Sequence, residues 1–323
     1  MSVSPKIKVV AIVGPTASGK TSLSIYLAQK IGREPRTGAS HPRGEVVSAD
    51  SRQVYRGLDI GTGKVTRAEM AGIPHHLLDV VPPSKVYNAS DFEKAAHKAI
   101  ELISSKHHVP IVVGGTGFYI DTLLGRMLFP DVPPNEKLRA RLDKKSVIQL
   151  HSMLEQLDPD RAKTVERHNK RRLIRALEIA AALGKSPKGG PALEGEGAYD
   201  VLWLGIRPTD EQLRHNIRTR LLERIGGGMV VEAQALHASG LSYKRMEGLG
   251  LEYRYLSYLL QGTLSKEQFV SELNTAIEQY AKRQIRWFKR NKDIHWLEHP
   301  PGTAKGRNEA VRLAKAFLHK HKK

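Results

Sequence analysis

The chain has no cysteine, few acidic residues relative to basic ones, and no long apolar run. Without cysteine there is no disulfide framework, no thiolate zinc site and no cysteine nucleophile. No apolar stretch approaches the roughly 18–20 residues that cross a bilayer. The first residues lead quickly into a short apolar run, and we do not expect them to form a signal peptide. These absences favour a soluble cytoplasmic protein without a membrane partner.

The shortage of acid leaves a large positive charge. Against 33 Asp and Glu stand 52 Lys and Arg, which gives a formal net charge of +19 over 323 residues. The excess is greatest after residue 200 and follows segments of helical character. This distribution is typical of a protein with a polyanionic partner such as nucleic acid, and a solvated basic face is the alternative.

Short apolar runs alternate with helical spacing along much of the chain. The β-branched runs at 8–13, 45–48, 109–113 and 201–206 predict buried strands. Helical patterns fall between and after them, at 22–31, 91–105, 210–225, 230–238, 253–260 and 266–290. Strands that alternate with helices in this way predict an α/β fold with a parallel sheet.

Residues 130–198 do not follow this pattern. A Pro-rich stretch at 131–134 opens the segment, residues 135–183 are helical in character, and residues 185–197 are rich in Gly and Pro. We therefore expect a catalytic core formed by residues 1–129 and 199–323. Residues 130–198 would form a helical insertion domain.

The clearest motif follows the first predicted strand. Residues 14–21 match the P-loop pattern G-x-x-x-x-G-K-[ST], with a strand before and a helix after them. Backbone N–H groups of such a loop converge on phosphate, Lys20 neutralises it, and the Thr21 hydroxyl can bind Mg²⁺. The predicted phosphate-binding residues are Gly14, Pro15, Thr16, Ala17, Ser18, Gly19, Lys20 and Thr21.

Other polar residues should meet the same edge of the sheet. Asp50 follows the second predicted strand, where it either faces a substrate or caps the next helix. The glycines at 114–117 follow the third strand, where they allow close approach to a ligand or form a tight turn. Arg218 and Arg220 are two residues apart on a predicted helix, so at most one can point into a site.

Several blocks in order resemble the tRNA dimethylallyltransferases, also called tRNA isopentenyltransferases. They are residues 14–21, 48–55, 59–64, 73–79, 112–119 and 280–288. The resemblance implies a P-loop NTPase-like fold and transfer of a dimethylallyl group from dimethylallyl diphosphate to N6 of adenosine 37 in tRNA. It also implies Mg²⁺ as cofactor and a monomer.

The resemblance assigns roles to particular residues. Asp50 would be the general base, and Thr21 and Arg220 would assist departure of the diphosphate. The residues expected to meet the tRNA anticodon stem-loop are Asp50, Ser51, Arg52, Gln53, Thr116, Arg139, Arg171, Arg172, Leu173, Ile174 and Arg175. The stretch Arg33–Gly44 is longer than the family pattern, and Gly248–Arg254 is an altered form of a segment that meets tRNA in the family.

Three other functions remain open from the sequence. An adenylate isopentenyltransferase would keep the P-loop and Asp50 but would need neither the insertion nor a basic surface. A P-loop small-molecule kinase would transfer phosphate from ATP. A non-catalytic RNA-binding protein would not need Lys20, Thr21 and Asp50 intact. The paired histidines at 75 and 76 carry no assigned chemistry, and we expect them to be structural.

Overall fold

The computed structural model describes residues 6–31, 44–127, 130, 132–184 and 197–320 of the chain. Contacts divide the chain into two compact units, Met1–Leu124 with Ala198–Lys323, and Gly125–Gly197. The second unit corresponds in extent to the insertion expected at 130–198. The long connection expected at Arg33–Gly44 lies outside the described residues apart from Gly44. The Gly/Pro-rich stretch at 185–197 does so apart from Gly197.

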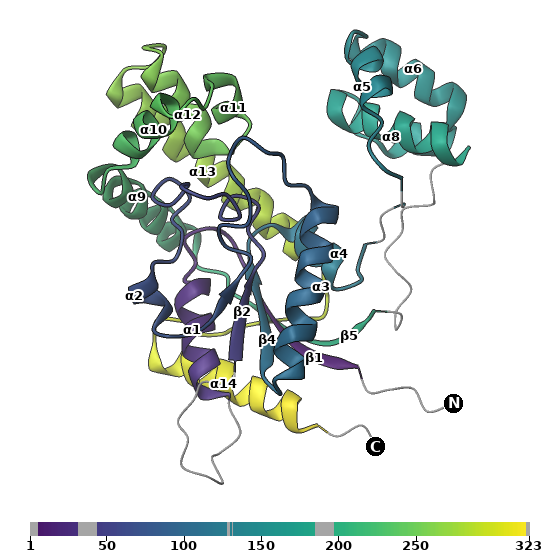
Figure 1. The fold of residues 1–323 in the computed structure, drawn as a ribbon. Helices are drawn as coiled ribbons and strands as arrows, with labels where there is room; N and C mark the ends of the chain where they lie inside the picture. Colours follow the sequence, from purple (N-terminus) through teal and green to yellow (C-terminus); the bar gives the residue numbers. More distant parts are fainter. Residues whose placement is uncertain (1–5, 32–43, 128–129, 131, 185–196, 321–323) are drawn as a thin grey trace, which may run out of the picture. The chain divides into compact units, whose positions relative to one another are not determined.

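The described part of the first unit contains a parallel sheet of six strands in the order β3–β2–β4–β1–β5–β6 (Figure 1). The strands are β1 (Ile7–Val13), β2 (Gly44–Ser48), β3 (His75–His76), β4 (Val109–Gly114), β5 (Tyr199–Gly205) and β6 (Ile294–Trp296). In the central register Ala11 of β1 lies between Val112 and Trp203. The predicted α/β fold with a parallel sheet is confirmed, and the two short edge strands are additions to it.

Ten described helices belong to the first unit. They are α1 (Lys20–Lys30), α2 (Arg67–Met70), α3 (Ala89–Ser105), α4 (Gly117–Leu123), α9 (Asp210–Gly226), α10 (Met229–Ala238), α11 (Tyr243–Glu247), α12 (Leu251–Leu260), α13 (Lys266–Phe288) and α14 (Ala304–His319). The helices predicted from spacing are present, with ends shifted by a few residues. Helices α2 and α11 are too short to show a helical period.

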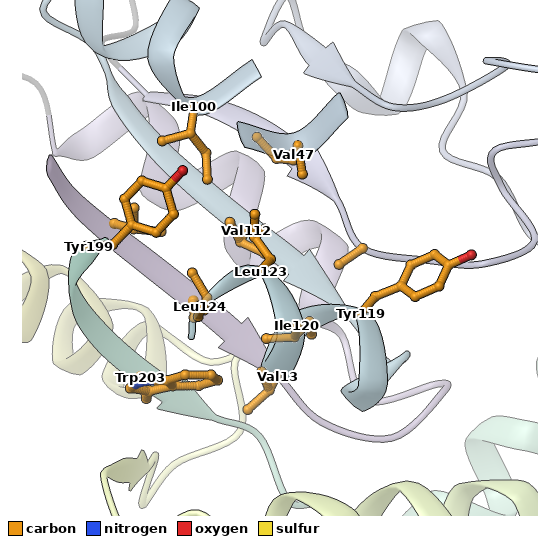
Figure 2. Packing of buried hydrophobic residues seen from close by; sticks show 14 of the residues in the cluster. Val13, Val47, Ile100, Val112, Tyr119, Ile120, Leu123, Leu124, Tyr199 and Trp203 are labelled. Atoms are coloured by element: carbon orange, nitrogen blue, oxygen red, sulfur yellow. The ribbon is translucent and has the colours of Figure 1, made fainter. Parts of the chain in front are cut away.

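The central strand β1 is buried on both faces because its side chains alternate between two cores. Val9, Ala11 and Val13 pack on one face with α3 and α4, and Figure 2 shows this core. Val10 and Ile12 pack on the other face with α1 and α14. The continuous apolar run at 8–13 therefore marks a strand covered by helices on both sides.

Helices α9 to α13 form a third packed group in the first unit (Figure 1). Tyr253 of α12 lies fully buried within it. Ala17 of the P-loop and Val54, shortly after β2, belong to the same core. The helical group is thereby packed directly against the carboxyl edge of the sheet. None of the helices that the structure describes is both long enough and apolar enough to span a membrane.

The second unit is a bundle of helices α5 (Glu136–Asp143), α6 (Val147–Leu157), α7 (Pro159–Thr164) and α8 (Lys170–Leu183) among its described residues. Asp158 ends α6 and its side chain accepts a hydrogen bond from the Arg161 N–H at the start of α7, and Asn169 caps α8. These caps divide the helical stretch expected at 135–183 into separate helices. A Cβ on Gly125 would lie 3.0 Å from the Cα of Gly197, so the two ends of the unit are adjacent.

Candidate active site

The P-loop connects the buried strand β1 to the first turn of α1. Gly19 precedes the helix with φ +86, a conformation that suits glycine, and Lys20 is the first helical residue. The Lys20 Nζ donates a hydrogen bond of 2.5 Å to the Pro15 carbonyl of its own loop. The Ser18 hydroxyl is buried without a hydrogen-bond partner in the described structure. The predicted motif therefore forms a loop with polar groups available for phosphate.

A cavity of about 1020 Å³ opens beside this loop, within the first unit. Its walls come from the P-loop and α1, from α2, from the start and middle of α9, and from the segment after β6. Lys20, Thr21 and Arg220 line it, together with Arg207 and Arg307. Five groups able to bind phosphate oxygens in one cavity indicate an anionic ligand.

The charge on Lys20 depends on its neighbours. Desolvation in the cavity wall and the positive charge of Arg220 lower the pKa of Lys20 to about 7, and the Asp50 carboxylate acts in the opposite direction. Arg220 from α9 and Asp50 from the end of β2 are thus both close enough to act on the P-loop lysine. Lys20 and Arg220 line the cavity, and Asp50, at the carboxyl edge of the sheet, acts on Lys20 without lining that cavity.

Arg218 and Arg220 separate as their spacing requires. Arg220 lies at the cavity, and one of its guanidinium nitrogens would be 3.1 Å from a Cβ on Gly63. Arg218 lies on another face of α9, beside Lys266 and Glu267 at the start of α13. Of the two arginines, only Arg220 lines the cavity.

Asp50 caps the turn that follows it. Its Oδ1 accepts hydrogen bonds from the backbone N–H groups of Arg52 (2.8 Å) and Gln53 (3.3 Å). One carboxylate oxygen therefore caps backbone N–H groups, but those of a turn and not of the helix that was expected to follow. No hydrogen bond to Oδ2 is found within the described structure, which leaves that oxygen to accept a proton or a substrate N–H.

Two turns lie side by side at the ends of β2 and β4. The Thr116 hydroxyl accepts a hydrogen bond of 3.2 Å from the Ser51 N–H and is within 3.4 Å of the Ser51 hydroxyl. A Cβ on Gly114 would lie only 2.2 Å from the Ala49 carbonyl oxygen, so glycine is required there. The glycines after β4 were expected to allow approach of a ligand or to form a tight turn, and at Gly114 the space is filled by the protein's own backbone.

Arg52 and Gln53 reach different neighbours. The Arg52 guanidinium donates to the Gly248 carbonyl (3.3 Å) and packs against Gly250, both in the altered segment Gly248–Arg254. The Gln53 amide donates to the Gly63 carbonyl (3.3 Å). Arg52 therefore connects the turn after β2, which was predicted to meet tRNA, with the helical group α9–α13.

The segment from Asp59 to Gly63 is anchored by Glu232 of α10. The Glu232 carboxylate accepts hydrogen bonds of 2.7–2.9 Å from the N–H groups of Asp59, Ile60 and Gly61, and one of 2.5 Å from the Tyr253 hydroxyl. Burial, followed by the charge of Glu232, raises the pKa of Tyr253 well above its ordinary range. This anchoring holds the loop against which both Arg220 and Gln53 rest.

Of the paired histidines, His76 takes part in a buried ion cluster at β2, whereas His75 Nδ1 contacts the Ile73 carbonyl at 2.8 Å. Glu45 is 1% exposed and contacts His76 Nε2 and His108 Nδ1, both at 2.7 Å, and Lys106 Nζ at 3.3 Å. Burial would raise the pKa of Glu45, but the hydrogen bonds from these three groups hold it below its ordinary value. This geometry agrees with the structural role expected for the histidines.

The residues predicted to meet tRNA in the second unit divide into three kinds. Arg139 and Arg175 both bind the buried carboxylate of Glu178. Leu173 and Ile174 are buried in the core of the unit, which corrects the expectation that they meet RNA: their side chains pack against the bundle. Arg171 and Arg172 are exposed, and Arg172 forms an ion pair of 3.0 Å with Glu166.

Two side chains of α13 join the site without having been assigned a role from the sequence. Gln284 links the P-loop to the turn after β4, and Tyr280 forms a hydrogen bond with Thr116. Burial and the Asp50 carboxylate raise the pKa of Tyr280 to about 12, so its hydroxyl stays protonated. Gln284 is the one polar member of the buried stripe Phe269, Leu273, Ile277, Ala281, Gln284 and Phe288. A polar residue on an otherwise apolar helix stripe was the sequence signal that could have identified Gln284 as a candidate site residue.

Known proteins share this architecture and sequence. The sequence model described as IPP transferase matches residues 53–291. The tRNA dimethylallyltransferase 2 of Treponema denticola is 41% identical over 304 residues, which cover 92% of this chain and 98% of that protein.

The chain belongs to the IPP transferase family.

Solved structures of similar proteins extend over nearly the whole chain. The tRNA isopentenylpyrophosphate transferase of Bacillus halodurans aligns with a TM-score of 0.68 and 31% identity over 97% of this chain and 98% of that one. A eukaryotic dimethylallyltransferase acting on tRNA aligns with a TM-score of 0.81 and 28% identity over 97% of this chain and 79% of that one. The P-loop, Asp50 and α14 lie outside the residues matched by the IPP transferase model.

Proposed function

We propose that this IPP transferase moves a dimethylallyl group from dimethylallyl diphosphate to N6 of adenosine 37 in the tRNA anticodon loop. The observation that carries the proposal is the gathering of Asp50 and Arg220 around Lys20 of the P-loop. A phosphate-binding lysine, an arginine and a carboxylate suit a reaction in which a diphosphate leaves and an amine loses a proton. The names of the relatives support the same reaction.

The donor's diphosphate would lie in the cavity beside the P-loop. The N–H groups at the start of α1, Lys20 and Arg220 would stabilise the negative charge that develops as the bond from the allylic carbon to the diphosphate oxygen breaks. Thr21 lines the cavity at the first turn of α1, and its hydroxyl fits a Mg²⁺ ligand beside phosphate oxygens and water. Such an ion would supply further neutralisation of the leaving diphosphate.

Asp50 would act on the acceptor. The adenine N6 is a weak nucleophile because its lone pair is delocalised into the ring. As N6 forms its bond to the allylic carbon, its proton would pass to Asp50 Oδ2, while Oδ1 keeps the turn in place through Arg52 and Gln53. The turn residues Ser51 and Thr116 would border the acceptor base.

The tRNA surface would extend along α13. The exposed basic residues at its carboxyl end and directly after it are Lys282, Arg283, Arg286, Lys289 and Arg290. Arg290 lies 3.9 Å above the ring of Trp287, and Phe118, next but one to Thr116, meets that ring edge-on at 6.3 Å. A cationic and aromatic surface beside Thr116 suits an unstacked anticodon-loop base with its phosphates. A monomer in the cytoplasm is the proposed working form.

Labelled dimethylallyl diphosphate tests the function directly. The protein is incubated with the labelled donor and either tRNA or AMP, and the acceptor that gains label is identified. We expect label in tRNA, at N6 of adenosine 37. Label in AMP would instead support an adenylate isopentenyltransferase. Phosphate transfer from ATP without prenyl transfer would support a kinase, and binding of tRNA without any transfer would support an RNA-binding protein.

A further inference from the structure

Gln284 of α13 is a buried polar side chain with two defined partners. It is 6% exposed, and its Oε1 accepts a hydrogen bond of 2.8 Å from the Thr16 N–H. Its Nε2 donates a hydrogen bond of 2.8 Å to the Gly115 carbonyl. A backbone donor on one side and a backbone acceptor on the other dictate the orientation of the amide. A side chain of this length that both donates and accepts is required at this position.

The two partners belong to the two loops between which the reaction would occur. Thr16 lies in the P-loop after β1, and Gly115 lies in the turn after β4, the neighbouring strand. The residue after Gly115 is Thr116, which binds Ser51 and Tyr280 on the acceptor side. A Cβ on Gly115 would lie 2.2 Å from Gln284 Nε2, so the amide occupies the space of the missing side chain.

We propose that Gln284 is a positioning residue that fixes the spacing between the donor loop and the acceptor turn. The proposal rests on the proposed function, because the spacing matters only if donor and acceptor react across these loops. Reacting atoms must approach to about 3–3.5 Å, and a misplacement of about 1 Å can lower the rate roughly 100-fold. Gln284 touches neither substrate in this arrangement and acts through the two loops that hold them.

The variant Gln284→Glu changes one partner while keeping the shape of the side chain. A carboxylate still accepts from the Thr16 N–H but has no proton to give the Gly115 carbonyl, and the two oxygens repel. A protonated carboxyl restores both hydrogen bonds. We expect the kcat of Gln284→Glu to be roughly 10–100-fold below wild type at pH 8, with the ratio to wild type recovering towards pH 6.

Three companion variants separate this role from a general packing role. Gln284→Met removes both hydrogen bonds at every pH and should lower kcat by a similar factor without recovery at pH 6. Gly115→Ala disturbs the same contact from the other side and should also lower kcat without a pH-dependent ratio. Gln261→Glu is the control, because the Gln261 side chain, at the carboxyl end of α12, is exposed and in the described structure donates to the Ser257 carbonyl of that helix. It should stay within about twofold of wild type at both pH values.

The measurements are single-turnover transfer to tRNA with both substrates saturating, separate Kd values for dimethylallyl diphosphate and tRNA, and melting temperature. The proposal expects the loss in kcat, with each Kd within about threefold of wild type. It is overturned if the pH-dependent recovery is absent in Gln284→Glu, if one Kd accounts for the whole loss, or if Gly115→Ala and Gln284→Met transfer normally. A wild-type protein that transfers no prenyl group overturns the proposed function itself. Wild-type transfer with unaffected variants overturns only the role of Gln284.

Discussion

Polar side chains predicted to bind substrate occur both in the second unit and at the cavity edge, by which we mean the loops at the carboxyl edge of the sheet beside the cavity. The two sets differ in the residues that hold them in place. At the cavity edge the contacts come from residues far away in sequence. Gln284 binds Thr16, Asn216 donates to the Ala17 carbonyl at 3.2 Å, and Glu232 binds the N–H of Ile60. Each of these bonds joins a helix of the α9–α13 group to a loop at the edge of the sheet.

In the second unit, several polar groups converge on one carboxylate of the same unit. Burial would raise the pKa of Glu178, but hydrogen bonds from Arg139, the Asn135 N–H and Arg175 hold it below its ordinary value. A buried carboxylate with two arginines stabilises the bundle and leaves those arginines less free to bind RNA. Charge alone therefore does not identify a binding residue, because the partner of each arginine decides whether it is available.

The largest expected effect is at Asp50, which tests whether the cavity edge is organised for chemistry. Asp50→Asn keeps a side-chain oxygen for the Arg52 and Gln53 N–H groups but removes the base. Transfer to tRNA should fall by roughly 10²–10⁴-fold, with little change in melting temperature. Asp160→Asn on the exposed surface of the second unit is the control and should leave both properties unchanged. Near-normal turnover of Asp50→Asn would remove Asp50 from the mechanism.

Added salt should weaken the binding of tRNA much more than the binding of dimethylallyl diphosphate. A tRNA bound through several phosphates releases counterions, so log K should fall linearly with log salt. For about three to four phosphate contacts, a fourfold increase in salt should weaken tRNA binding roughly 10–100-fold. Binding of dimethylallyl diphosphate in the cavity should change much less. Filter binding for tRNA and calorimetry for the donor measure the two slopes, and equal slopes would contradict a separate extended tRNA surface.

Local patterns predicted the parts of the site that depend on a few consecutive residues. The P-loop at 14–21 and Asp50 after β2 needed only a strand, a turn and a helix in order. Contacts between distant segments were not predicted: the apolar stripe of α13 marks Gln284 as unusual, but no local pattern identifies its partner. The bond from Gln284 to Thr16 spans 268 residues, and Glu232 reaches a loop 171–173 residues away.

The limits of the fold prediction have similar physical causes. Strands β3 and β6 have two and three residues, too few to show an alternating pattern, and they form through pairing with β2 and β5. In α8 the family resemblance assigned tRNA contacts to all five residues from Arg171 to Arg175. Helical geometry placed Leu173 and Ile174 on the buried side and Arg171 and Arg172 on the exposed side.

The lowered pKa of Lys20 predicts proton uptake when the donor binds. In the free protein Lys20 titrates near pH 7, and a bound diphosphate should shift its pKa back towards the ordinary value of 10.5. The titration of Lys20 should therefore leave the affinity for the donor unchanged below pH 7. From pH 7 to 9 it should weaken that affinity by up to about tenfold per pH unit. Calorimetry at pH 8 in buffers of different ionisation enthalpy counts the proton. Lys20→Arg, which stays charged, should lack the uptake, and an identical uptake in that variant would assign the proton to another group.

The smallest expected effects separate the exposed arginines of the second unit from the paired ones. Arg172 has a side chain 63% exposed, whereas that of Arg175 is 35% exposed and bound to Glu178. Arg171→Ala with Arg172→Ala should weaken tRNA binding roughly three- to tenfold, because exposed arginines contact phosphates for position. The melting temperature and donor affinity should not change.

Arg175→Ala breaks a bond to a buried carboxylate and should destabilise the second unit by about 1–3 kcal/mol. The matched pair of variants is compared by melting temperature, by tRNA affinity and by donor affinity. One outcome would contradict this comparison: Arg175→Ala weakens tRNA binding more than the double variant of Arg171 and Arg172, while stability is unchanged. The bond to Glu178 would then not restrain Arg175, and the partner of an arginine in the structure would not decide whether it can bind RNA. If both variants weaken donor binding and tRNA binding equally, the second unit supports the fold and does not bind tRNA.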